Sequence, residues 1–63
     1  MNKKLTLIAA KIKKELGSNF ISMKAYPPVD GIIIIYRGGL ISNIPCQYRI
    51  EKTEKENNLY IFN

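Results

Sequence analysis

Four consecutive isoleucines, residues 32–35, constrain the fold of this chain more than any other feature. Isoleucine is β-branched and favours extended strands, in which successive side chains point to opposite faces of the sheet. Ile33 and Ile35 therefore share one face, and Ile32 and Ile34 share the other. Because a strand that is apolar on both faces is stable only when both faces are covered, the rest of the chain or a partner has to supply two covering layers.

The length of the chain makes two covering layers hard to build. It has 63 residues, which suits one small domain spanning residues 1–63. The core of a domain this small rarely supplies more than about 3–5 kcal/mol without a disulfide, a metal or oligomerisation. Cys46 is the single cysteine and there is no histidine, so an intrachain disulfide is impossible and a structural zinc site is excluded in practice. These limits favour a homodimer or a bound partner.

Residues 3–16 are predicted to form an amphipathic helix. Their apolar side chains recur at spacings of three and four, which places them on one stripe. Asn2 suits the N-cap, and Gly17 suits a left-handed C-cap. The stripe consists of Leu5, Ile8, Ala9, Ile12 and Leu16.

The remainder of the chain is predicted to be β-structure. Period-two alternation, apolar runs and turn residues divide it into strands at residues 20–26, 32–37, 40–44, 46–52 and 59–62, some of them short. Gly38 and Gly39 fit a two-residue hairpin turn, and Pro45 interrupts or borders the ladder. The expected fold is α+β, with one N-terminal helix packed on an antiparallel β-meander sheet of three or four strands.

A single helix covers one face of such a sheet, so apolar side chains are left on the other face. An exposed apolar patch of that kind usually marks an interface. We expect a second copy of the chain or a target protein to cover it; alternatively, the sheet curls and the loop at 27–31 folds over it. The residues expected at an interface, including one on the outward side of the helix, are Leu7, Ile33, Ile35, Tyr36, Arg37, Tyr60 and Phe62.

Charge is concentrated on the predicted helix. The net charge is +5, and residues 1–17 carry five lysines and one glutamate. A basic helix face is typical of binding to a nucleic-acid backbone, where lysines give affinity without sequence readout. An ordinary solvated face is the alternative interpretation. The residues expected to contact phosphates are Lys3, Lys4, Lys11, Lys13 and Lys14.

The four tyrosines all lie on predicted strands, where aromatic rings beside basic groups can stack unpaired bases. Tyr36 beside Arg37 and Tyr26 near Lys24 fit this idea, although packing in a core or an interface explains the tyrosines as well.

The sequence gives little support for catalysis. The commonest general base is absent because there is no histidine. Cys46 is best explained as a small core residue, because it belongs to an alternating strand in which Tyr48 and Ile50 also face the core. Most carboxylates lie on a mixed-charge turn. We expect no enzyme, no metal site, no cofactor and no small-molecule substrate.

No apolar run is long enough to span a membrane, and one free cysteine fits the cytoplasm. We therefore predict a small, basic, non-enzymatic protein that binds nucleic acid through the lysine-rich helix. The alternative is a protein that binds and inhibits a host defence or nucleic-acid-processing protein through an apolar sheet face. The abundance of Ile, Lys and Asn suggests AT-rich codons, which for so short a chain is associated with phages and mobile elements.

Overall fold

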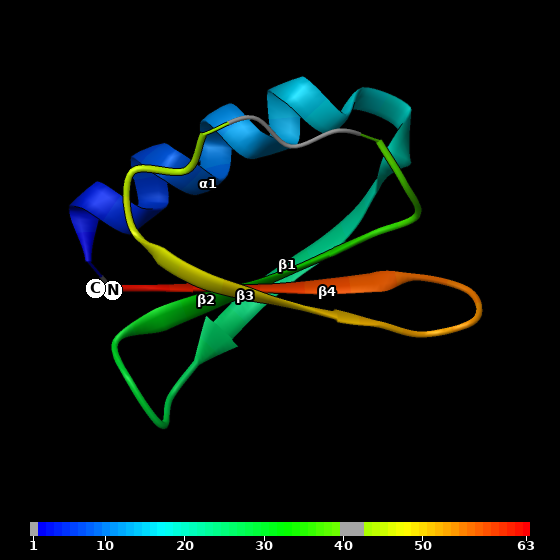
Figure 1. The fold of residues 1–63 in the computed structure, drawn as a ribbon. Coiled ribbons are helices and arrows are strands. Elements are labelled where there is room, and N and C mark those ends of the chain that lie inside the picture. The colour runs from blue at the N-terminus through cyan, green and yellow to red at the C-terminus, as the bar shows by residue number, and fades with distance from the viewer. Residues whose placement is uncertain (1, 40–42) are drawn as a thin grey trace.

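The computed structural model describes residues 2–39 and 43–63 (Figure 1). It confirms the α+β class, with one N-terminal helix and one antiparallel four-stranded sheet. The elements are α1 (Lys3–Leu16), the short 3-10 helix η1 (Gly17–Asn19), β1 (Phe20–Tyr26), β2 (Gly31–Tyr36), β3 (Gln47–Lys52) and β4 (Asn57–Phe62).

The helix begins and ends where the sequence predicts. The Asn2 side chain accepts hydrogen bonds from the backbone N–H groups of Lys4, at 2.8 Å, and Leu5, at 3.4 Å, and so satisfies two donors that have no partner within the helix. Gly17 closes the other end with a φ of 57° and donates its N–H to the carbonyl of Lys13. The predicted apolar stripe is buried along its whole length.

The order of the strands, β1-β2-β4-β3, departs from a simple meander because β4 lies between β2 and β3. Since β2 and β3 are both antiparallel to β4, they run in the same direction. A two-residue hairpin cannot join strands that run in parallel. A two-residue turn at Gly38 and Gly39 therefore does not connect β2 with the next described strand, β3.

The predicted strand at 40–44 lies partly outside the described residues, which exclude 40–42. The other two members, Asn43 and Ile44, belong to no strand. Ile44 instead packs against the hydrophobic core and lines, with Ile8 and Ile12, a small hollow beside α1. This segment therefore helps to cover the side of the sheet on which α1 lies.

Two of the four isoleucines are covered on the helix side of the sheet, which we define as the face toward α1. Ile32 lies opposite Ile61 of β4, and Ile34 lies opposite Leu59. All four side chains are fully buried or nearly so. Together with Tyr36, they form one core cluster with the apolar stripe of α1.

A β-bulge changes the facing of one predicted residue. The register shifts between Phe20 and Ser22, so Phe20 lies opposite Tyr36 and packs against the core. Simple alternation predicts that Phe20 faces away from Met23, and this prediction is wrong because the extra residue of the bulge reverses the alternation at that point.

The helix covers the middle of the sheet and leaves both edge strands partly bare. Tyr48 and Ile50 of β3 lie on the helix side by their register, yet about half of each side chain is exposed. Ile21 and Met23 of β1 are exposed to a similar degree. One helix is too narrow for four strands, since helices are about 10 Å across and four strands spaced about 4.8 Å apart are wider.

Candidate nucleic-acid interface

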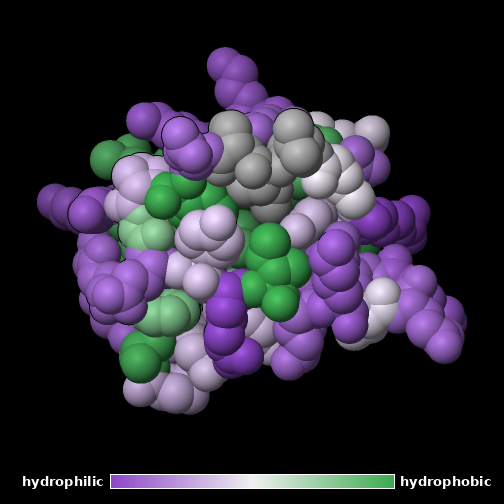
Figure 2. Space-filling model, in the orientation of Figure 1, coloured by the Kyte–Doolittle hydropathy of each residue, from purple (hydrophilic) through white to green (hydrophobic). Residues whose placement is uncertain are grey.

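The five lysines of α1 are all exposed, and we call this set the lysine face: Lys3, Lys4, Lys11, Lys13 and Lys14. They lie on the side of α1 that points away from the sheet or on its flanks, because the apolar stripe occupies the opposite side. Figure 2 shows long hydrophilic side chains projecting from the upper rim of the molecule, where α1 lies. The structure therefore leaves all five predicted phosphate-binding residues exposed, on the outward side of α1 and on its two flanks.

The position of two of these lysines works against helix stability. The first turn of α1 contains no acidic residue and begins with Lys3 and Lys4. The N-terminal end of a helix carries a partial positive charge, so cations in the first turn are unfavourable by a few tenths of a kcal/mol each. Lys13 and Lys14, in the last turn, are favourable by the same argument. A locally unfavourable choice of residue is expected where function requires it.

Two members of the lysine face lie at its flanks. The Nζ atom of Lys13 lies 5.0 Å from the centroid of the Phe20 ring, at the start of β1. Lys4 lies close enough to Cys46, on the other flank, for its charge to act on the thiol. Burial raises the pKa of the Cys46 thiol, while a backbone hydrogen bond from Phe62 and the charge of Lys4 offset part of the rise. Lys3, Lys11 and Lys14 are left as the outward members.

Leu7 lies among the outward lysines and is 67% exposed. Because most of this apolar side chain is in contact with water, it contributes little to the stability of the monomer. It would be buried by any ligand that covers the lysine face.

The opposite face of the sheet, which we call the open face, carries a second cluster. The Arg49 guanidinium lies 4.0 Å from the centroid of the Tyr60 ring, and Tyr60 contacts Tyr26 edge to face with the ring centroids 5.1 Å apart. A nitrogen of Arg49 also donates a hydrogen bond of 3.4 Å to the Tyr26 hydroxyl. These three side chains, the sheet-face cluster, span β1, β4 and β3.

The other two isoleucines, Ile33 and Ile35, lie on the open face and are covered to different degrees. Ile33 belongs to the open face, lies opposite Lys24 and Tyr60, and is only 9% exposed. Long and aromatic side chains from the neighbouring strands therefore cover it within a single chain. Ile35 is covered less, because its neighbours in the register are Ser22 and Asn58.

The predicted interface residues do not form one surface. Ile33, Ile35, Tyr60 and Phe62 share the open face by their register. Tyr36 lies instead on the helix side, where it is buried in the core and its pKa is raised by that burial. Leu7 lies on the side of α1 that points away from the sheet, and Arg37 follows β2 and is exposed.

Two members of the sheet-face cluster, Arg49 and Tyr26, are absent from the predicted interface. Arg49 meets Tyr60 because β3 pairs with β4, and Tyr26 reaches Tyr60 diagonally across Gly31 of β2. The register confirms that Tyr26 and Lys24 lie on the same face of the sheet. Tyr36, the other tyrosine expected to stack on bases, is too buried to do so. The signal that would have identified Arg49 is the strand order, which alternation alone does not contain.

Asn58 adds an unsatisfied polar atom to the open face. Its side-chain oxygen is buried and accepts no hydrogen bond within the described residues. Asn58 lies between Ile35 and Glu51 in the register. A buried acceptor without a donor is destabilising by about 1–3 kcal/mol, so a donor from water or a partner would be favourable here.

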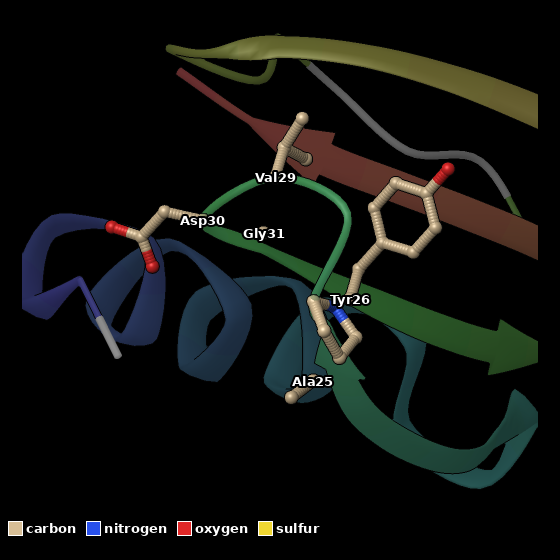
Figure 3. Close-up of a pocket in the computed structure, with 6 residues that line it drawn as sticks. Ala25, Tyr26, Val29, Asp30 and Gly31 are labelled. Atoms are coloured by element: carbon tan, nitrogen blue, oxygen red, sulfur yellow. The ribbon is translucent and has the colours of Figure 1, made fainter.

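A shallow hollow of about 510 Å³ lies at the loop between β1 and β2. Figure 3 shows that its side chains diverge: the Tyr26 ring and Val29 lie on one side of the loop, and the Asp30 carboxylate points away from them. The hollow therefore does not gather groups that could act on one ligand.

Comparison with protein-family models, with curated proteins and with solved structures found no match to this chain. Within the described residues, no helix is both long enough and apolar enough to cross a membrane.

Proposed function

We propose that this protein is a non-enzymatic nucleic-acid-binding protein that holds a phosphate backbone on the lysine face of α1. The observation that supports the proposal most strongly is the exposure of all five helix lysines, two of which lie where the helix dipole disfavours them. Phosphates would compensate that unfavourable placement, since they supply negative charge close to the N-terminal turn.

The dimensions of the lysine face suit a duplex backbone. From Lys3 to Lys14 the helix rises about 17 Å, at 1.5 Å per residue. That length corresponds to about five base pairs, at 3.4 Å each. Lysine provides point charges without the planar fork that reads guanine, so we expect binding that depends little on sequence.

The test compares two triple variants that change net charge equally. The first replaces Lys3, Lys11 and Lys14 with Gln on the lysine face. The second, which serves as the control, replaces Lys24, Lys52 and Lys55 with Gln on the open face and the β3–β4 hairpin. Binding of each to a labelled mixed-sequence DNA duplex is followed by fluorescence anisotropy at low salt.

The lysine-face variant is expected to lose at least about tenfold in affinity, because each phosphate contact releases a counterion. The control variant is expected to bind within about threefold of the unsubstituted protein when the comparison is repeated at about 0.1 M salt, where a Debye length of about 10 Å screens distant surface charges. Equal losses in both variants would show that net charge, and not the lysine face, determines binding. Absence of binding in the unsubstituted protein would refute the proposed function.

The sheet-face cluster supports a second candidate function: binding and inhibition of another protein, of the kind that phages and mobile elements direct at host proteins. Tyr and Arg are the residue types that dominate the energetic centres of protein interfaces. Tyr60 and Arg49 are already stacked on each other, and the unsatisfied oxygen of Asn58 lies on the same face. A partner would therefore meet a preorganised aromatic centre with a polar border.

This candidate is tested with Ile35→Lys, which places a charge on the open face at a half-buried position. The matched control is Tyr48→Lys on the helix side, where the side chain is already about half exposed. Proteins captured from a lysate by the immobilised chain should be lost with Ile35→Lys and retained with Tyr48→Lys. If the two variants capture the same proteins, the open face is not the docking surface.

A further inference from the structure

The two edges of the sheet, β1 and β3, are protected to different degrees. Proteins protect edge strands from pairing with other chains by charged side chains, prolines or bulges. On β3 three of the six residues are charged: Arg49, Glu51 and Lys52. The segment of β1 beyond the bulge, residues 22–25, contains one charge and no proline.

This stretch of β1 also exposes apolar side chains. Ile21 is 39% and Met23 is 38% exposed. Met23 lies on the helix side with Ala25, because they pair with Ile34 and Ile32, whereas Ile21 is the extra residue of the bulge. The helix does not reach them because it packs over β2. Within the described residues, the β1 edge therefore combines backbone groups that lack a strand partner on one side with exposed apolar side chains.

We propose that β1 pairs antiparallel with β1 of a second copy of this chain, about a two-fold axis at Met23, so that the two sheets form one sheet of eight strands. In this register Met23 lies opposite the partner's Met23 on the helix side. On the open face, Ser22 lies opposite the partner's Lys24. The pairing is self-complementary, as a two-fold interface requires.

Two neighbouring registers also pair residues that lie on the same face of the sheet in both copies, but these registers are less favourable. An axis at Lys24 places two ammonium groups directly opposite each other, which is destabilising. An axis at Ser22 extends the pairing into the bulge between Phe20 and Ser22, where the alternation of faces is lost. The axis at Met23 avoids the pair of lysines, keeps the regular pairing at residues 22–24 clear of the bulge, and brings the two Met23 side chains together.

The geometry has an electrostatic consequence. Antiparallel pairing at an edge requires a two-fold axis perpendicular to the sheet, so both copies of α1 lie on the same side. Each copy has a net charge of +5, and Lys13 lies on the flank of α1 next to β1. Because salt screens this repulsion, added salt strengthens the dimer, whereas it weakens binding to a nucleic-acid backbone.

The test is the mass in solution, measured by light scattering at several protein concentrations and two salt concentrations. The unsubstituted chain is expected to approach twice its 7.2 kDa with rising concentration, and to do so earlier at higher salt. Met23→Lys should hold the mass at 7.2 kDa, because it places like charges opposite each other on the axis. Ile50→Lys, at a similarly exposed position of β3, should behave as the unsubstituted chain does.

A second variant keeps the proposal testable if Met23→Lys fails to fold. Directly opposite residues of an antiparallel pair have Cα atoms about 4.5–5.5 Å apart, which a disulfide can bridge. Met23→Cys in a Cys46→Ser background should give a disulfide-linked dimer when diamide takes up the two thiol hydrogens. Ile50→Cys in the same background should stay monomeric on a non-reducing gel.

Three results would overturn the proposal: a monomer at all concentrations, a dimer that Ile50→Lys dissociates and Met23→Lys does not, or equal cross-linking of the two cysteine variants. None of these results depends on whether the protein binds nucleic acid.

Discussion

Truncation of Ile34 to alanine should remove most of the stability of this fold. Ile34 is fully buried, faces α1, and lies between Met23 of β1 and Leu59 of β4. Replacing a buried isoleucine with alanine is destabilising by about 2–5 kcal/mol, through lost transfer free energy and the cavity that remains. A chain of this length has a total stability of about 3–9 kcal/mol, taking 0.05–0.15 kcal/mol per residue.

The adjacent residue supplies the control. Ile35 is half-buried on the open face, and its neighbours in the register, Ser22 and Asn58, leave it partly in contact with water. Ile35→Ala leaves no closed cavity and should be destabilising by about 1 kcal/mol. Urea unfolding followed by circular dichroism gives both values from the shift in midpoint at constant slope.

Equal losses for the two variants would refute this reasoning. They would mean that the open face is covered as closely as the helix side, by a layer that a single chain does not provide. A loss below about 1 kcal/mol for Ile34→Ala would contradict the assignment of Ile34 to the centre of the core.

Two further predictions concern the backbone and pH. Gly31→Ala should be destabilising by about 1–3 kcal/mol, because the added Cβ would lie 2.7 Å from the backbone oxygen of Ile61, and urea unfolding measures it. Burial raises the pKa of Tyr36 above its usual value of 10.0, so its contribution to stability is complete below that pH and is lost as the pH rises through the higher value in the folded protein. Tyr36→Phe should therefore flatten the alkaline part of the stability profile, measured by thermal unfolding, and an unchanged profile would contradict the assignment.

The local structure was largely predictable from the sequence. The helix follows from its apolar period of three to four residues, and its ends follow from the capping preferences of Asn2 and Gly17. The strand with the isoleucines was predicted to within a residue at each end. These features depend on residues that are close together in the chain, so they can be predicted from the sequence pattern.

The strand order was not predictable in the same way. Gly38 and Gly39 are typical hairpin residues, yet β2 pairs with β4, and the next described strand, β3, is not a neighbour of β2. Leu59 and Ile61 cover the central isoleucines better than a short strand beside Pro45 would, and that preference depends on packing between residues far apart in the chain.

The candidate sites also differ in how far they could be predicted, because one depends on local structure and the other on strand order. The lysine face depends on one helix, so the periodicity of that helix was enough to predict that its members lie away from the apolar stripe, although Lys4 and Lys13 lie on opposite flanks. The sheet-face cluster needs three strands in the correct order, so its Arg49 was missed and Tyr36 was assigned to a surface that it does not reach.

The most direct test of the proposed function is the salt dependence of binding to a DNA duplex. If three to five lysines of α1 contact phosphates, the logarithm of the association constant should fall linearly with the logarithm of salt concentration, with a slope of about −3 to −4.5. The variant that lacks Lys3, Lys11 and Lys14 should reduce the steepness of that slope by about 3. A flat dependence, or no binding at low salt, would contradict the proposal that the lysine face holds a phosphate backbone.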